Sequence, residues 1–316
     1  MASVISAAAA YSQYDPATGT TGDPLTIGAT VGVAIFGAFI WALLNALRVD
    51  QQGWINNFAA AWQIVTTIVI VICVLAMPAK DPDIPSNWIW TYPYNGTGIP
   101  SENFGYVMLL GLLYACFSFS GYEAGAHMAE ETRNASTSSP WGVVATCCTV
   151  AALGYIYIIG LMYGTTSIMG MSFADWSARS PASSSSDFYY YWNDVGGYLT
   201  EAMATVSGSS IADLYVAACG ATTGRALIAL LIINVFFAGI SSLTVTSRIA
   251  YAMARDGAFP YSWAIRPVSP FTKTPLATVA LVFVVDALLL LLPLGATQAF
   301  AAVTSITVIG YQISCE

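Results

Sequence analysis

The stretch LYACFSFSGYEAGAHMAEETRN, residues 113–134, places Glu123 inside a predicted membrane span, residues 104–128, and continues into the charged residues Glu130, Glu131 and Arg133. Glycine is a poor helix former and serine competes for backbone hydrogen bonds, so we expect the helix to break near Ser120 and Gly121. An ionisable group at membrane depth is costly unless it faces a partner or a water-filled cavity, which makes Glu123 a candidate functional residue. Gly121 and Gly125 also have the spacing of a helix-packing face, and the residues alone leave that alternative open.

The composition of the whole chain is that of a membrane protein. Of its 316 residues, 57% are hydrophobic and only 8% are charged, and the mean hydropathy is +0.67. Soluble domains carry roughly 25% charged residues, which excludes a soluble enzyme, a disordered chain and a nucleic-acid-binding protein. The net charge of -8 is not accompanied by any basic run, so nucleic acid is not an expected partner. The lipid bilayer is an expected partner.

Uncharged apolar stretches of about 20 residues predict an all-α, polytopic membrane protein. We expect six complete spans and a seventh that ends with the chain. The opening ASVISAAAA is too short to cross a bilayer and is typical of the end of a helix. The predicted spans cover residues 25–47, 54–76, 104–128, 141–164, 226–252, 275–293 and 296–315.

The distribution of Lys and Arg predicts the orientation in the membrane. The segments after the first, third and fifth spans hold six of these residues, against three in the other segments, so the first set is expected in the cytoplasm. Two long external segments follow from this. Residues 78–103 contain a glycosylation sequon at Asn95, and residues 165–225 end in an amphipathic stretch expected to form a lid-like helix on the outer surface.

No pattern in the chain points to a metal, a cofactor or an enzyme. The six cysteines show no CxxC or Cys/His spacing, and His127 is the single histidine. No pair of nucleophile and base is visible either. We therefore expect a protein that is not an enzyme and that holds neither a metal nor a cofactor.

Two long runs resemble the amino acid-polyamine-organocation superfamily of permeases. Residues 117–142, FSFSGYEAGAHMAEETRNASTSSPWG, are similar to helix 6 and its following loop, and residues 236–263, FFAGISSLTVTSRIAYAMARDGAFPYSW, are similar to helix 8 and its loop. The nearest branch is that of the eukaryotic GABA, choline and amino acid permeases. The resemblance implies that residues 1–316 form a single partial permease domain, with the end of helix 3 followed by helices 4 to 10.

The fold implied by the resemblance is an incomplete leucine-transporter-like inverted repeat, in which substrate lies between unwound parts of helices 1 and 6. The implied function is transport of amino acids or related small amines, of the GABA, choline or polyamine class, by secondary active alternating access. The membrane would be the plasma membrane or an internal organelle membrane. Two alternatives remain: a truncated fragment that does not transport, and a seven-span receptor.

The resemblance also implies the site residues. Substrate contacts fall around the break and on helix 8, at Phe117, Phe119, Ser120, Gly121, Glu123, Ser241 and Ser242. Ordinary core packing is the alternative for the phenylalanines, and Ser and Thr are common packing residues in membrane helices.

Three residues are candidates for ion coupling: Glu123, His127 and Gln63. Gln63 stands where some proton-coupled relatives have a lysine, and it cannot titrate, which shifts attention to Glu123. Glu123 and His127 lie on one helical stripe that leads from the break toward the cytoplasm. Proton coupling is therefore preferred to sodium coupling.

Overall fold

The structure is a computed structural model that describes residues 1–13, 23–47, 49–77, 90, 103–119, 121–129, 132, 134–165, 209–259 and 261–295, with separate residues from 299 to 310. Within these ranges the regular elements are all helices. They are α1 (Ala2–Ser12), α2 (Ile27–Asn45), α3 (Val49–Ala76), α5 (Phe104–Ser118), α6 (Ala124–His127), α7 (Ala135–Thr165), α10 (Ser210–Arg255), α11 (Ser262–Ile265), α12 (Leu276–Leu290) and α13 (Leu292–Gly295).

In the described part of the chain, five helices are long and apolar enough to cross a membrane. Their apolar spans are Ile27–Asn45, Gln52–Ala76, Ala135–Gly164, Ala218–Arg255 and Leu276–Gly295. Large apolar side chains such as Phe36 and Leu109 are more than half exposed on the outside of the bundle, as lipid-facing residues are. The prediction of an all-α, integral, multi-pass membrane protein is confirmed.

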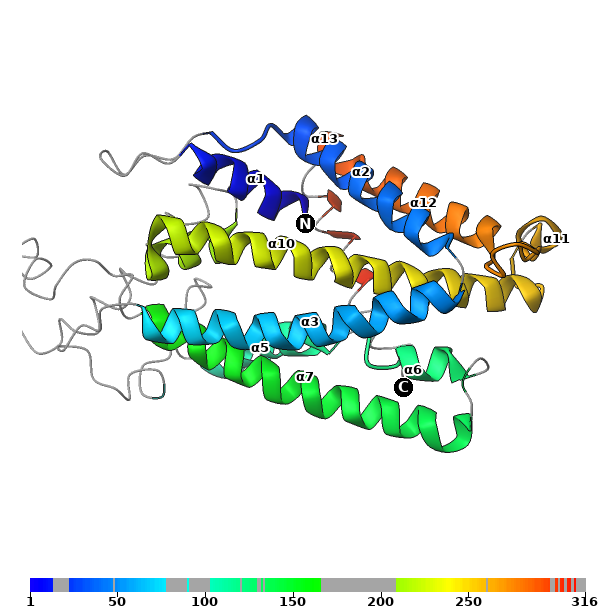
Figure 1. The fold of residues 1–316 in the computed structure, drawn as a ribbon, viewed down its shortest axis with the longest axis horizontal. Coiled ribbons are helices and arrows are strands. Elements are labelled where there is room, and N and C mark those ends of the chain that lie inside the picture. Colours follow the sequence, from blue (N-terminus) through cyan, green and yellow to red (C-terminus); the bar gives the residue numbers. More distant parts are fainter. Residues whose placement is uncertain are drawn as a thin grey trace, which may run out of the picture.

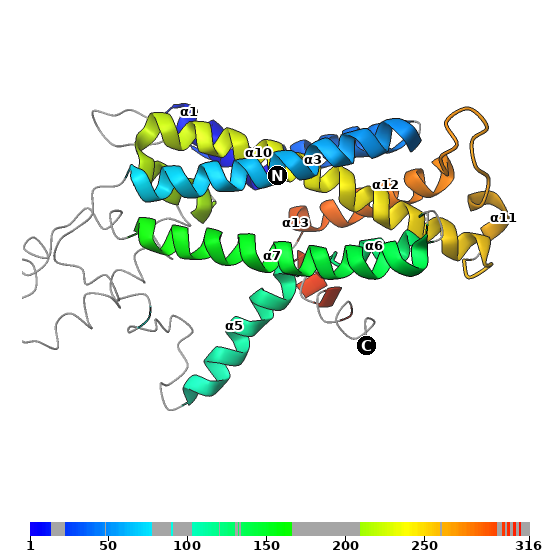
Figure 2. The same cartoon turned by 60° about the horizontal axis from the view of Figure 1, so that its bottom comes forward.

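The long helix α10 occupies the centre of the bundle (Figure 1). It packs against α3, which in turn packs against α7, and on its other side against α2 and α12. The short helix α1 lies along α10 and contacts α2. Figure 2 shows α5 leaning away from this bundle, although it leads directly into α6, which packs against α7 and contacts α10.

Small residues let the central helices approach one another closely. A Cβ atom at Gly160 or Gly164 of α7 would collide with Val71 or Val74 of α3. These glycines are four residues apart, a spacing typical of close crossings between membrane helices. In the same way, Gly239 of α10 leaves room for the ring of Trp41 on α2.

A bend at Gly220 divides α10 into two parts, because its φ of 77° and ψ of 165° are not helical. The preceding segment, residues 210–219, folds back so closely that a Cβ at Gly224 would meet the backbone of Val216. Ala212 and Tyr215 are 0% exposed there, in a cluster with residues of α1 and α3. This part of the predicted external helix is therefore buried, and its placement on the outer surface was wrong. Its apolar side chains recur at helical spacing and face the bundle.

Five of the six complete predicted spans correspond to membrane-length helices and differ from them only at their ends, whereas the third, residues 104–128, is divided between α5 and α6. The helix expected from 141 begins at Ala135, and the one expected from 226 begins at Ser210. The opening segment is helical, as expected. The seventh span lies outside the described residues apart from separate positions, and the sequon at Asn95 lies outside them as well.

The segments predicted to share the cytoplasmic side do lie at one end of the bundle. The ends of α2 and α10 and the start of α7 are together at the right of Figure 1. At the end of α10, the amide groups of Gly257 and Ala258 donate to the carbonyls of Ala254 and Met253, at 3.3 and 2.9 Å. Gly257 has a φ of 78°, and this arrangement ends the helix after Arg255.

Candidate functional site

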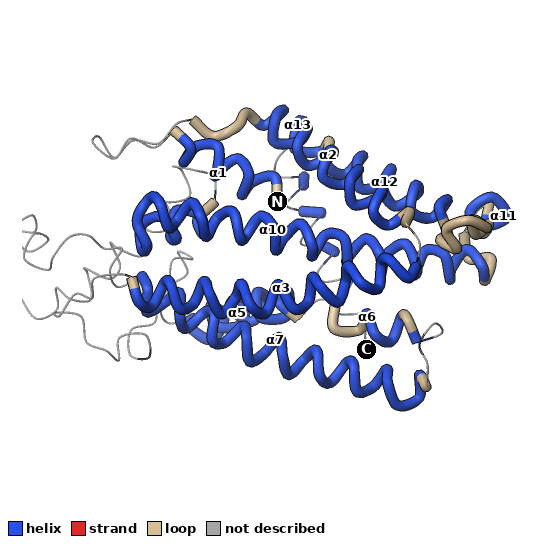
Figure 3. Tube along the Cα trace, in the orientation of Figure 1, coloured by secondary structure: helices blue, strands red, loops and turns tan. Residues whose placement is uncertain are grey.

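The third predicted span is broken where the sequence predicted it. Helix α5 ends at Ser118 and α6 begins at Ala124, and the described residues between them, 119 and 121–123, form turns (Figure 3). Gly121 has a φ of 98°, a backbone conformation that side chains with a Cβ rarely adopt. The amides of Tyr122 and Ala124 donate to the carbonyls of Phe119 and Gly121, at 3.3 and 3.1 Å. The interruption is confirmed, and Gly121 is what permits it.

Glu123 stands at the N-cap position of α6 and is half-buried. Its Oε2 atom is buried, and within the described part of the chain nothing donates a hydrogen bond to it. A buried carboxylate oxygen without a donor is energetically unfavourable. A cation, an amine or a proton would relieve this cost at that atom.

The structure describes only some of the other site residues predicted around the break. Phe119 is half-buried in the turn, and His127 is exposed in the last turn of α6. Ser120 and the side chain of Phe117 lie outside what the structure describes. The amide of His127 donates to the carbonyl of Glu123 at 3.1 Å, so the two residues are one helical turn apart, with the side chain of His127 exposed and Oε2 of Glu123 buried.

The serines predicted on helix 8 differ from each other in their surroundings. The hydroxyl of Ser241 donates to Oδ1 of Asn56 on α3, at 2.9 Å, and to the carbonyl of Phe237, at 3.3 Å. Ser242 is exposed. Ser241 thus joins two helices.

Gln63 lies at the contact between α3 and α10. Its Nε2 donates to the carbonyl of Asn234 at 3.5 Å, and the neighbouring Thr66 hydroxyl donates to Oδ1 of Asn234 at 2.8 Å. Sequence reasoning missed Asn234, although it is a polar residue in an apolar helix.

A polar seam between α3 and α10 runs along these contacts. Asn234, Ser241 and Arg248 recur every seven residues along α10. Each contacts a polar side chain of α3: Asn234 accepts from Thr66, and Ser241 donates to Asn56. At the end of the seam nearest the start of α3, Nη2 of Arg248 donates to Oε1 of Gln52 at 3.3 Å. This seven-residue repeat is the signal in the sequence that could have revealed the seam.

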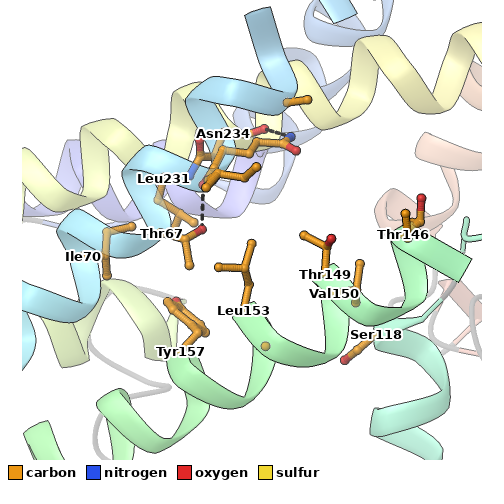
Figure 4. A pocket seen from close by; sticks show the side chains of 15 residues that line it. Thr67, Ile70, Ser118, Thr146, Thr149, Val150, Leu153, Tyr157, Leu231 and Asn234 are labelled. Atoms are coloured by element: carbon orange, nitrogen blue, oxygen red, sulfur yellow. Dashed lines mark hydrogen bonds between the residues drawn. The ribbon is translucent and has the colours of Figure 1, made fainter. Parts of the chain in front are cut away.

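A cavity of about 690 Å³ opens beside the seam, between α3, α7 and α10 (Figure 4). Ser118, the last residue of α5, also lines it, so the cavity reaches the start of the helix break. Gln63 and Asn234 form part of its wall. In Figure 4, Thr149 and Tyr157 of α7 lie across the cavity from α3 and α10.

A sequence profile of the family described as "Amino acid permease" matches residues 1–315. The chain belongs to this family. Its relatives are named as permeases and transporters, not as enzymes. Membership of a permease family also argues against the alternative of a seven-span receptor.

Three relatives illustrate the similarity. Amino-acid permease BAT1 of Arabidopsis thaliana is 30% identical over 276 residues, which are 87% of this chain and 48% of the relative. An amino-acid permease of Schizosaccharomyces pombe is 28% identical, over 88% of this chain and 44% of the relative. A protein of Candida albicans named putative polyamine transporter is 27% identical, over 88% and 45%. The chain thus spans about half the length of the relatives it matches. No solved structure matches it.

Proposed function

We propose that this permease chain supplies helices 4 to 10 of a secondary active transporter for amino acids or related small amines. The observation that carries the proposal is the buried, unpartnered Oε2 of Glu123 at a break in a membrane helix. Helices in carriers are interrupted where substrate and coupling ions bind, because free backbone groups and charges are tolerated only beside a cavity.

The break offers the two kinds of group that an amine needs. The partial negative charge at the C-terminus of α5 favours a cation. The Glu123 carboxylate adds a full negative charge five residues beyond Ser118. An ammonium group held between them would form charge-assisted hydrogen bonds.

For ion coupling we propose a proton carried by Glu123. Gln63 cannot titrate, and its amide hydrogen-bonds to α10. Ser241 donates its hydroxyl proton to Asn56 and thereby joins α3 to α10. The exposed His127 is a less suitable coupling group than the buried oxygen of Glu123.

The test needs the 316 residues joined to the helices that would precede and follow them in a permease, which we call the completed carrier. Gly121→Leu should abolish uptake of labelled amino acids into proteoliposomes, because leucine does not favour a φ of 98° and would project where substrate approaches. Gly111→Leu, on the exposed surface of α5, is the matched control and should transport normally. Normal substrate affinity in Gly121→Leu would overturn the proposed site.

The second reading, a chain that does not transport on its own, is supported by the share of the relatives that it covers. In that reading the 316 residues insert into membranes but show no uptake. Uptake by the isolated chain in liposomes would contradict it.

A further inference from the structure

The cavity between α3, α7 and α10 has largely apolar walls, into which a few uncharged polar side chains, among them Gln63 and Asn234, are set. Its volume of about 690 Å³ lies in the usual range of about 300–1,000 Å³ for small-molecule sites. None of the described residues that line it is Asp, Glu, Lys, Arg or His. We propose that this cavity receives the side chain of the transported amino acid and selects an uncharged, hydrogen-bonding side chain, such as a carboxamide. The inference rests on the proposed transport function and names the substrate class.

The absence of charge argues against the cationic tails of lysine or of a polyamine. An ammonium group moved from water into this cavity would lose its hydration without meeting a carboxylate. Glu123 is not in the cavity wall, so it is free to bind the α-amino group of the substrate. A substrate whose single positive charge is at its α-amino group would suit both Glu123 and the uncharged cavity.

Two amide groups in the wall supply the hydrogen-bonding capacity. Thr66 donates to Oδ1 of Asn234, and no described group accepts a hydrogen bond from Asn234 Nδ2. Gln63 uses Nε2 toward the backbone of Asn234, and no described group donates to its Oε1. A free donor and a free acceptor on neighbouring helix turns match the C=O and NH₂ of a carboxamide.

The geometry of the wall also suits an aliphatic stem. Figure 4 shows Leu153 and Leu231 among the side chains around the cavity, and Ile70 lies at one end. Ser118, the last residue of α5 before the break, lines the cavity, so the cavity adjoins the break that contains Glu123. A ligand that fills the apolar part but lacks the amide would leave Gln63 and Asn234 unpaired, and binding sites discriminate strongly against such a loss.

The experiment measures binding of four probes, L-glutamine, L-leucine, L-lysine and putrescine, to the 316-residue chain in lipid nanodiscs by saturation-transfer NMR. The cavity is built from this chain alone, so weak binding is measurable without transport. Glutamine should bind roughly tenfold more tightly than leucine, the factor expected for one buried hydrogen bond. Lysine and putrescine should bind more weakly still.

Asn234→Asp is the decisive variant, because it keeps the acceptor for Thr66 and places a negative charge in the wall. It should weaken glutamine binding about tenfold and strengthen lysine binding, a gain that misfolding cannot produce. Asn56→Asp is the matched control: it makes the same change at the same pair of helices, keeps the acceptor for Ser241, and lies outside the cavity.

Each remaining outcome counts against the cavity assignment. It is overturned if glutamine does not bind, if lysine or putrescine binds as tightly as glutamine, or if Asn234→Asp behaves like Asn56→Asp. Uptake by the completed carrier would still support the proposed function in all three cases. If the completed carrier shows no uptake while the chain still binds glutamine, the transport proposal fails and the cavity remains only a binding site for a carboxamide side chain.

Discussion

The phenol oxygens of Tyr157 and Tyr215 lie 2.6 Å apart and join α7 to the segment that precedes the bend in α10. Tyr215 is 0% exposed, and Tyr157 also lines the cavity. The pair therefore connects the wall of the cavity to the buried cluster at the end of the bundle. A hydrogen bond in such surroundings meets little competition from water.

Tyr215→Phe should lower the free energy of unfolding by about 1 kcal/mol, because it leaves the Tyr157 hydroxyl without this partner. Tyr155→Phe is the control: Tyr155 lies on α7, the helix of Tyr157, and is 70% exposed, so the substitution should change the free energy of unfolding little. The measurement is reversible unfolding of the purified chain in mixed micelles. Equal stability of the two variants would show that the pair contributes nothing.

Gly164→Leu should separate α7 from α3, because the added side chain would occupy the position of Val74, which is 0% exposed. Overpacking of a buried contact costs roughly 1–3 kcal/mol. Gly142→Leu, on the same helix with no atom within 4 Å of the added Cβ, is the matched control. Thermal denaturation should show a lower midpoint for the first variant alone, and two equal midpoints would refute the close crossing.

Gly220→Ala should destabilise the chain by roughly 1–3 kcal/mol, the cost of holding a residue with a Cβ in a sparsely populated conformation. Space is not the reason, since nothing lies within 4 Å of an added Cβ at this position. Gly28→Ala in α2, where the backbone is helical, should be neutral or stabilising by helix propensity. A neutral Gly220→Ala would mean that the segment before the bend does not fold back in the membrane.

The membrane helices and the broken span could be predicted from the sequence because local features decide them. Apolar length predicts a spanning helix, and Ser and Gly around Glu123 predict its interruption. The positive φ of Gly121 is also a local feature, because glycine is the residue that adopts such a conformation most readily. These features depend on a residue and its near neighbours.

The cavity and the seam could not be predicted, because they depend on which faces of distant helices meet. Asn234 is 171 positions from Gln63 along the chain, and their contact depends on how α3 crosses α10. The burial of Tyr215 was missed for a related reason: an amphipathic helix can cover a surface or fill a bundle, and the bend at Gly220 decides between them. Sequence reasoning thus predicted which segments form helices but not how those helices pack against one another.

Cysteine labelling should place positions 95 and 183 on one side of the membrane and positions 133 and 255 on the other. The physical reason is the bias of Lys and Arg toward the cytoplasmic segments. Single cysteines at these four positions are treated with a membrane-impermeant thiol reagent in intact cells. Labelling of position 255 but not of 183 would reverse the orientation.

Glu123→Gln in the completed carrier should make uptake independent of external pH, whereas the unmodified carrier should take up more substrate as external pH falls. If a proton enters with the substrate, it must reside on a group that can bind and release it, and Oε2 of Glu123 is buried without a donor. Glutamine keeps the shape of the side chain but cannot exchange the proton. Asp286→Asn is the matched control, because Asp286 is a half-buried carboxyl in the middle of α12 and should not alter the pH profile. A pH profile that is unchanged in Glu123→Gln, or lost in Asp286→Asn as well, would assign coupling to a different group.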